Sequence, residues 1–429
     1  MTTETLTPRK TIDKGLFLIV LTLMLFGIVM VYSASNVIAE QKFGSSTHFL
    51  VNQFLRAMMG IVILMFAAKY DYHNYKRHTM MMLLIAGVLC AVVLTLGQLK
   101  GAARWLQVGG FGIQPSEIAK IALVFYVAGY MDSKGDRIRD FQNGLLPPLI
   151  MAGVFAVAII LQPNFSTAAV VMGMVILMLF IGGMDIKHLG MMAAVAIPVA
   201  LLTVILSPYR RARLMAFLDP TADMQGSGYQ IKQSLISFAN GGLTGVGVGQ
   251  GQQKLLFLPE PFTDFIYSII GEEMGFIGAV LVLGLFIVFL FRAIKTARTA
   301  PDMYGFYLAT GIIISIVVYA LVNAGVAVGV FPTTGLPMPF ISYGGTSLLF
   351  TCFLVGVLLN ISSQTVSKDE AMKATAPEYA MRSRFTENFN VGGEIGEEEE
   401  YSTDTTPVPT KKAPAKKAVR TNIVGMDMS

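Results

Sequence analysis

The sequence predicts an all-α protein that crosses a membrane about ten times, and two observations lead to this fold class. Apolar residues make up 54% of the 429-residue chain and charged residues only 14%, against about 25% charged in ordinary soluble domains. Apolar windows of roughly 20 residues, the length of a membrane-spanning helix, recur along the chain. A polytopic membrane protein explains both features, and a water-soluble enzyme explains neither.

The windows follow one another closely, separated by short polar segments except at one place. In order, the expected spans cover residues 15–35, 50–68, 79–97, 116–131, 145–161, 165–183, 188–206, 266–291, 303–324 and 340–361. Basic residues are more numerous on one side of this array, and the positive-inside rule makes that side cytoplasmic. The sequence therefore predicts a multi-pass protein of a cytoplasmic membrane with both termini in the cytoplasm.

Two segments stand apart from this array, and they define the expected domain organisation. Residues 1–362 form a ten-helix membrane domain that contains one long extracytoplasmic loop, 207–265. Within that loop, apolar residues at helical spacing in 229–238 predict an amphipathic helix, and the glycines of 241–251 indicate a flexible connector. The polar residues 363–429 lack the apolar side chains of a core, which is typical of a disordered cytoplasmic tail.

Cysteine, histidine and basic residues exclude several other classes. Cys90 and Cys352 both lie within apolar runs, and the four histidines show no ligand spacing, so we expect neither a disulfide framework nor a Cys/His metal site. No basic stripe with interleaved aromatic residues is present in the membrane domain, so we expect no nucleic-acid partner.

Ionisable residues inside apolar spans are costly, about 3 kcal/mol each at the bilayer centre, so each needs a reason. Arg56 lies in the second span, and Glu272 and Glu273 lie in the eighth. Glu117 and Lys120 lie three residues apart near the outer end of the fourth span, on one helix face. Two interpretations of this last pair stay open, namely a self-contained ion pair and a role with substrate or protons.

Asp264 precedes the eighth span, where a membrane boundary is followed at once by apolar residues. A carboxylate in such a place has a raised pKa, which suits a general base. The alternative is structural, because Thr263 or Asp264 before a long helix is also an ordinary N-cap.

Three arginines, Arg210, Arg211 and Arg213, follow the seventh span on the side that the alternation of spans places outside. Arginine matches the geometry of phosphate in a bidentate way, so the cluster indicates a site for an anionic headgroup or a diphosphate. Attachment to bulk anionic lipid is the alternative.

Six ordered motifs give the chain a resemblance to a known family. They are Gly101-Ala-Ala-Arg-Trp105, Gln114-Pro-Ser-Glu-Ile-Ala-Lys120, Gln162-Pro-Asn-Phe-Ser-Thr167, Leu258-Pro-Glu-Pro-Phe-Thr-Asp-Phe265, Gly271-Glu-Glu-Met-Gly275 and Pro339-Phe-Ile-Ser-Tyr-Gly-Gly-Thr-Ser347. Over residues 15–362 the chain closely resembles the SEDS family of bacterial wall polymerases, whose members include FtsW, RodA and SpoVE. Pro339-Phe-Ile-Ser and Ser227-Gly-Tyr-Gln resemble the division branch, FtsW, more than the elongation branch, RodA.

The resemblance implies a peptidoglycan glycosyltransferase that polymerises lipid II on the outer face of the membrane, in cell division. It also implies a class B penicillin-binding transpeptidase and other divisome membrane proteins as partners, with Asp264 as the catalytic residue. We expect the substrate to contact the following residues: Arg104, Glu117, Lys120, Arg210, Arg211, Arg213, Lys254, Ser342, Tyr343 and Gly344. A divalent cation, Mg²⁺ or Mn²⁺, would supply the same electrostatic stabilisation as the basic residues.

Two departures from the family pattern limit what can be transferred. Asn164 and Ser166 stand where relatives often have aspartate and glycine, and Phe262 stands where many have histidine. A carboxylate or an imidazole at those positions cannot be essential in this chain.

Two other function classes stay open, a flippase or transporter of lipid-linked precursors and a non-catalytic divisome scaffold. Paired half-helices and an inverted repeat would favour the transporter, and the sequence shows neither.

Overall fold

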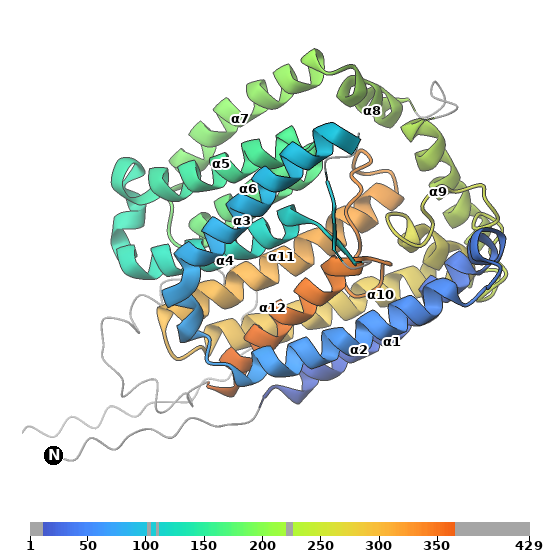
Figure 1. Cartoon of the computed structure of the whole chain (residues 1–429), viewed down its shortest axis with the longest axis horizontal. Helices are drawn as coiled ribbons and strands as arrows, with labels where there is room; N and C mark the ends of the chain where they lie inside the picture. Colours follow the sequence, from blue (N-terminus) through green and yellow to red (C-terminus); the bar gives the residue numbers. More distant parts are fainter. Residues whose placement is uncertain (1–11, 101–103, 109–110, 220–225, 365–429) are drawn as a thin grey trace, which may run out of the picture. The chain divides into compact units, whose positions relative to one another are not determined.

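The computed structural model describes residues 12–364, with gaps at 101–103, 109–110 and 220–225. Twelve α-helices and one small hairpin make up this region (Figure 1). The elements are α1 (Lys14–Phe43), α2 (His48–Lys69), α3 (His73–Lys100), β1 (Leu106–Val108), β2 (Phe111–Ile113), α4 (Pro115–Lys134), α5 (Leu146–Leu161), α6 (Phe165–Ile181), α7 (Ile186–Leu206), α8 (Pro208–Leu218), α9 (Ser227–Gly241), α10 (Ile266–Arg298), α11 (Met303–Ala327) and α12 (Gly345–Ser363).

Ten of these helices correspond to the ten expected spans, so the all-α polytopic fold class is confirmed. Eight described helices are long and apolar enough to cross a membrane, the fourth of them including the π-helical turn Phe141–Leu145. The other two expected spans are α6, which has 17 residues, and α4, which carries Glu117 and Lys120. The expected tail, 363–429, lies outside the described residues apart from its first two positions.

The core lies where α11 and α12 pack among the other helices. Both have most of their side chains buried, and α12 packs along α2 while α11 packs on α4 and α10. In contrast, α7 has no buried residue and lies along the upper edge of the view in Figure 1. Its apolar side chains face outward, as expected for a helix surrounded by lipid.

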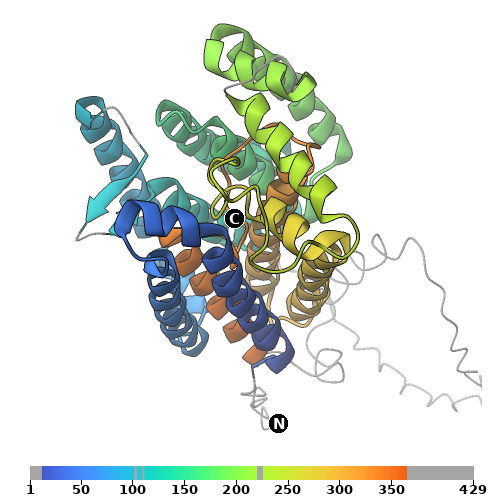
Figure 2. The same cartoon turned by 90° about the vertical axis from the view of Figure 1, so that its right-hand side faces the viewer.

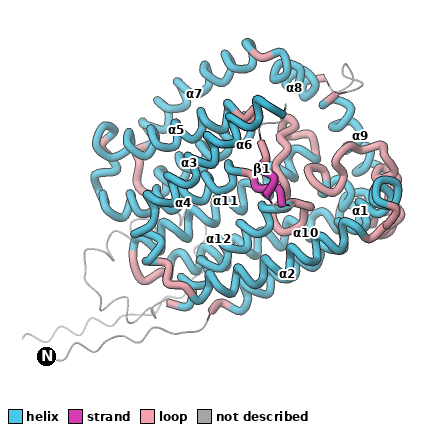
Figure 3. The backbone as a smooth tube through the Cα atoms, viewed as in Figure 1, coloured by secondary structure: helices cyan, strands magenta, loops and turns pink. Residues whose placement is uncertain are grey.

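The structure differs from the sequence prediction in three places. Residues 340–344 form a loop, and α12 begins only at Gly345. A two-stranded antiparallel hairpin, β1–β2, precedes α4 where no strand was expected, and it lies near the loops at one end of the helices (Figure 3). Residues 208–218 form a helix, α8, that opens with Pro208 in its first turn, although the sequence suggested only a loop there. The predicted amphipathic helix is confirmed as α9.

The glycine-rich segment after α9 is not the flexible connector that its composition suggested. A Cβ atom on Gly245 would lie 2.2 Å from the carbonyl oxygen of Glu273, and one on Gly275 would lie 2.3 Å from the amide nitrogen of Gly245. Both glycines have positive φ angles, so no other residue fits either position without strain. Figure 2 shows the yellow loop between α9 and α10 folded against the start of α10.

This close packing explains an interruption in α10. Gly275 has non-helical angles, φ 68° and ψ −168°, inside the helix. The freed backbone groups pair with the loop, because Phe276 N donates to Gly242 O at 2.9 Å and Val246 N donates to Glu272 O at 3.1 Å. A buried break in a spanning helix is tolerated when other groups satisfy its backbone in this way. The described residues contain one such interruption and no second helix paired with it.

Candidate functional site

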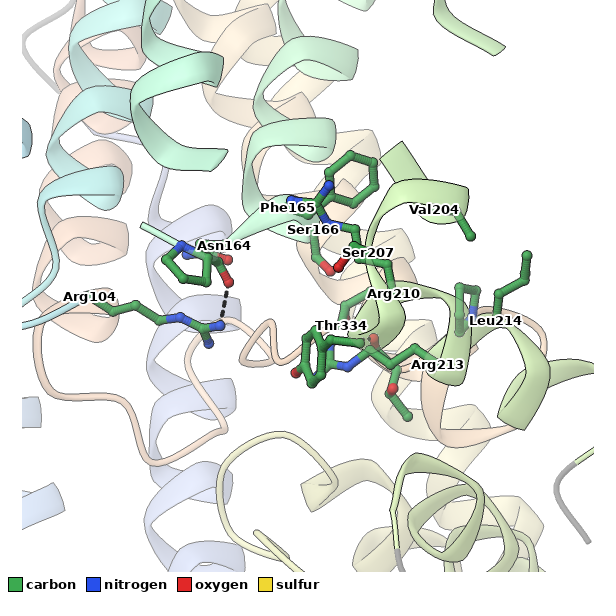
Figure 4. Close-up of a pocket in the computed structure, with 14 residues that line it drawn as sticks. Arg104, Asn164, Phe165, Ser166, Val204, Ser207, Arg210, Arg213, Leu214 and Thr334 are labelled. Atoms are coloured by element: carbon green, nitrogen blue, oxygen red, sulfur yellow. Dashed lines mark hydrogen bonds between the residues drawn. The ribbon is translucent and has the colours of Figure 1, made fainter. Parts of the chain in front are cut away.

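A cavity of about 580 Å³ lies at the loop end of the helices. It is bounded by Arg104, which precedes the hairpin, by the start of α6, by the α7–α8 junction and by the loop that follows α11 (Figure 4). The residues that line it are Arg104, Pro163, Asn164, Phe165, Ser166, Val204, Ser207, Tyr209, Arg210, Arg213, Leu214, Pro332, Thr333 and Thr334. Three of the arginines proposed from the sequence therefore face one space, Arg210 and Arg213 from α8 and Arg104 from the segment before β1.

Each of these arginines is anchored to a carbonyl group. Arg104 donates to Pro163 O, Arg210 Nη1 donates to Thr203 O at 3.3 Å, and Arg213 Nη1 donates to Thr333 O at 3.0 Å. Within the described residues none of the three has a carboxylate within ion-pair distance.

The Nε atom of Arg213 is also buried without a hydrogen-bond partner in the described chain. Burial lowers the pKa of the Arg213 guanidinium, and nearby Arg104 lowers it further. The cavity is thus a positively charged space with unsatisfied donors, which suits a phosphate group.

Asp264 lies beside this cavity, immediately before α10. Its peptide carbonyl accepts a hydrogen bond from Asn323 Nδ2 at 2.8 Å, so α11 holds its backbone. The loop before α12 holds the two preceding residues, since Ser342 Oγ donates to Thr263 O at 2.6 Å and Tyr343 N donates to Phe262 O at 2.8 Å. Ser342 and Tyr343, expected from the sequence to contact substrate, therefore position the segment that contains Asp264.

The carboxylate of Asp264 is not a helix cap. The N-cap of α10 is Phe265, and no side chain caps the helix, so the structural alternative for Asp264 is wrong. Asp264 Oδ2 lies 3.3 Å from the position that a Cβ on Gly335 would occupy, so the carboxylate is next to the loop that follows α11. In the described chain, no side chain forms an ion pair with this carboxylate.

The environment of Asp264 favours its protonated form more than water does. Burial raises the pKa of this carboxyl to about 6, Glu260 raises it as well, and Arg213 and Arg104 oppose the rise. A carboxylate with a pKa close to neutrality can accept a proton during a reaction and still be ionised beforehand. The charges of Arg213 and Arg104 therefore act on the Asp264 carboxylate, which places the three residues near one another.

The remaining predicted site residues lie elsewhere. Glu117 and Lys120 form a buried ion pair at 2.7 Å, with Tyr319 donating to Glu117 at 3.3 Å and its ring 4.0 Å from Lys120 Nζ. This arrangement matches the self-contained ion pair, and neither residue lines the cavity. Arg211 is exposed and also does not line it. Gly344 caps α12, with only ordinary van der Waals distances around it.

Lys254 was expected to bind diphosphate, and the structure places it in a different setting. Its Nζ lies 2.6 Å from Glu273 Oε1 and 3.2 Å from Ser33 Oγ, with both ionic side chains buried. Its charge is already compensated and it does not line the cavity, so the structure does not support a role for Lys254 in binding diphosphate. Glu272 is similarly occupied, because it accepts hydrogen bonds from the backbone amides of Gln252 and Gln253.

Some residues that shape the site were not found from the sequence. Asn323 and Thr333 hold Asp264 and Arg213 through single hydrogen bonds. A signal existed for Asn323, because an amide inside the apolar α11 is as unusual as a charge there. Thr333 acts through its backbone carbonyl, for which the sequence carries no signal.

The donor set does not form a recognisable metal site. No group of three or more His, Cys, Asp or Glu side chains that could hold a metal ion occurs in the part of the chain that the structure describes. Arginines dominate the cavity, and Mg²⁺ prefers oxygen ligands. The residues that line the cavity therefore do not fit a divalent cation.

Comparisons with known proteins agree with this arrangement. A family model described as "Cell cycle protein", FTSW_RODA_SPOVE, matches residues 13–367. The chain is 42% identical over 354 residues to the "Probable peptidoglycan glycosyltransferase FtsW" of Trichlorobacter lovleyi, covering 82% of this chain and 93% of that protein. It is 40% identical over 362 residues to the "Stage V sporulation protein E" of Bacillus subtilis, covering 83% of this chain and 99% of the other.

Solved structures give the same result at the level of the fold. A structure described as "Structural coordination of polymerization and crosslinking by a peptidoglycan synthase complex" superposes with a TM-score of 0.68 at 27% identity, covering 82% of this chain and 97% of that one. The rod shape determining protein RodA of Thermus thermophilus superposes with a TM-score of 0.60, covering 83% of this chain and 98% of that one; at 24% identity this likeness concerns the fold alone. The chain is therefore a multi-pass membrane protein of the SEDS family, which comprises FtsW, RodA and SpoVE.

Proposed function

We propose that this protein is a peptidoglycan glycosyltransferase that polymerises lipid II into glycan strands on the outer face of the cytoplasmic membrane, in cell division. The observation that carries the proposal is the position of Asp264, which has a pKa of about 6 and no ion-pair partner among the described residues, beside a cavity lined by three arginines. Similar proteins are named probable peptidoglycan glycosyltransferases, which supports the same reaction.

The geometry suggests how the residues divide the chemistry. In the proposed step, the 4-hydroxyl of one lipid-linked disaccharide attacks the anomeric carbon of another, and the bond from that carbon to the lipid diphosphate breaks. Asp264 takes the proton of the attacking hydroxyl as general base. Arg213 and Arg104 stabilise the negative charge that gathers on the departing diphosphate. Asp264 acts on the attacking sugar, and the two arginines act on the departing diphosphate of the other lipid. Both groups must lie near the bond that is exchanged, and the mechanism therefore requires Asp264 to be close to the arginines.

Partners and orientation belong to the same proposal. We propose that the termini lie in the cytoplasm, which puts the loops 242–265 and 328–344 on the outer side. A similar solved protein belongs to a complex described as coordinating polymerisation and crosslinking, which supports a class B penicillin-binding transpeptidase as partner. Other divisome membrane proteins are proposed as further partners.

Replacement of Asp264 by asparagine tests this function. Asparagine is nearly isosteric but cannot accept the proton, so we expect polymerisation to fall by about a hundredfold or more. The assay uses the purified full chain with its transpeptidase partner and lipid II, and measures glycan strand length without any membrane gradient. Wild-type protein that is folded, bound to its partner and inactive would contradict the proposal and favour a flippase or a scaffold. A variant that polymerises at the wild-type rate would contradict the role of Asp264.

A further inference from the structure

Arg56 is a charged residue that the proposed mechanism does not use. It lies about two turns into α2, a predominantly apolar helix whose other polar residues are His48, Asn52, Gln53 and Lys69. Its guanidinium carbon is 4.5 Å from the centre of the Tyr343 ring, and its Nη1 atom is buried without a hydrogen-bond partner in the described chain. No described carboxylate lies within ion-pair distance of it. An uncompensated charge in a spanning helix is costly, which indicates a function.

The surroundings of Arg56 contain further polar groups without partners. Within the part of the chain that the structure describes, Thr346, which is 6% exposed, has no hydrogen-bond partner for its Oγ1, and the fully buried Gln53 has none for its Oε1. Thr346 belongs to the first turn of α12, which begins at Gly345. A Cβ on Gly345 would lie 3.9 Å from the guanidinium carbon of Arg56 and 3.7 Å from Gly112 O. The start of α12 and the guanidinium of Arg56 are therefore neighbours.

The start of α12 adds its own attraction for an anion. No side chain caps this helix, so its first amide groups lack side-chain acceptors. Free amides and the positive end of the helix dipole attract phosphate, and here they lie beside an unpaired guanidinium. Two separate elements thus favour an anion at one place: Arg56 on α2, and the uncapped start of α12 with the buried hydroxyl of Thr346.

The position of Arg56 relative to Asp264 suggests which ligand this site binds. The loop between α11 and α12 meets Arg213 at Thr333, Asp264 at Gly335 and Arg56 at Tyr343. The two arginines therefore meet opposite ends of one loop, and the carboxylate contacts the loop between them. A glycosyltransferase that joins two lipid-linked sugars must hold two diphosphates. The cavity beside Arg213 can hold the diphosphate of one lipid, so a second binding site is needed for the other.

We propose that Arg56 and the N-terminus of α12 form a second anion site, which binds the diphosphate of the lipid-linked acceptor. This inference rests on the proposed function, because it assigns the second substrate of the same reaction. The exposed side of α2 favours a lipid over a free phosphate, since Phe54, Leu55, Met58 and Met59 are 37–55% exposed around Arg56. An apolar chain can lie along this surface while its phosphates reach the guanidinium.

Counting bound lipids by native mass spectrometry tests the second site. The probe is undecaprenyl diphosphate, added to the purified full chain. We expect wild-type protein to retain two molecules, and Arg56→Gln and Arg213→Gln to retain one each. Affinity at the altered site should fall at least tenfold, about the effect of losing one charge-assisted contact. Arg292→Gln, at the far end of α10, is the matched control and should retain two.

A second variant guards against a folding defect in Arg56→Gln. Gly345→Asp adds a carboxylate at the start of α12, where a negative charge is favourable for the helix but repels phosphate. It should keep the wild-type unfolding temperature and retain one lipid. If both Arg56→Gln and Gly345→Asp retain two molecules, the second site is wrong.

Competition distinguishes the possible sources of the phosphate. Phosphatidylglycerol or inorganic pyrophosphate at the same concentration should not displace the lipid at Arg56. Displacement by phosphatidylglycerol would mean a site for bulk anionic lipid and would overturn the proposal, and displacement by pyrophosphate would overturn the role of the apolar surface. Wild-type protein that binds two lipids but does not polymerise would contradict the proposed function alone, whereas a polymerising protein that binds one would contradict this inference alone.

Discussion

Two charged regions at the same end of this protein differ in how their charges are compensated. In the break of α10, Lys254 is paired with Glu273, and Glu272 accepts backbone amides from the glycine-rich loop. Around the cavity, Arg213 donates to the carbonyl of Thr333, and neither Arg213 nor Asp264 has an ion-pair partner among the residues that the structure describes. The charges of the first region hold the loop, and we propose that those of the second bind the substrate. The presence of charged residues therefore does not distinguish the candidate functional site from the region around Lys254. The distinguishing feature is that the charges of Arg213 and Asp264 are not neutralised by an ion pair within the described residues.

The most severe way to break the first region is to remove one member of its ion pair. Lys254→Met leaves Glu273 buried without its cation, and we expect a loss of about 3–5 kcal/mol in unfolding free energy. The double variant Lys254→Met with Glu273→Gln removes both charges and should recover most of that loss. Thermal unfolding of the detergent-solubilised chain measures both. A single variant that unfolds normally but has lost activity would instead place Lys254 at the diphosphate.

A smaller loss is expected when the loop is pushed away from α10. Gly275→Ala puts a methyl group 2.3 Å from a backbone amide at a positive φ, so we expect about 2–3 kcal/mol of destabilisation. Gly284→Ala in the same helix is the matched control, because nothing lies within 4 Å of its Cβ position. That control should be neutral or slightly stabilising. Equal unfolding temperatures for the two variants would show that the break does not depend on close packing.

In the cavity the expected effects are on activity and not on folding. Arg213→Lys keeps the positive charge but removes the planar fork that matches phosphate, so we expect polymerisation to fall about tenfold. Arg211→Lys changes the same chemistry on the same helix outside the cavity and should leave the rate unchanged. Glycan strand assays on both variants separate the two residues. Equal losses would mean that the whole basic helix α8 binds anions without using the cavity.

The sequence predicted much of the fold because apolar runs of spanning length are a strong local signal. It predicted α9 from apolar spacing, and missed α8 because the arginines in that helix suggested a loop. The site was harder, since its contacts join distant segments. Ser33 meets Lys254 across 221 positions, and Arg213 meets Thr333 across 120. No local pattern separates a lysine that will be neutralised from an arginine that will stay free.

The pH dependence of polymerisation tests the central claim most directly. As a general base, Asp264 is active when ionised, so the rate should rise with pH through a midpoint near 6, the pKa of its carboxyl. Arg213 lowers that pKa and Glu260 raises it. Arg213→Gln should therefore move the midpoint to higher pH and Glu260→Gln to lower pH, whereas Arg56→Gln should leave it in place. If neither substitution beside Asp264 moved the midpoint, this carboxylate would not be the base.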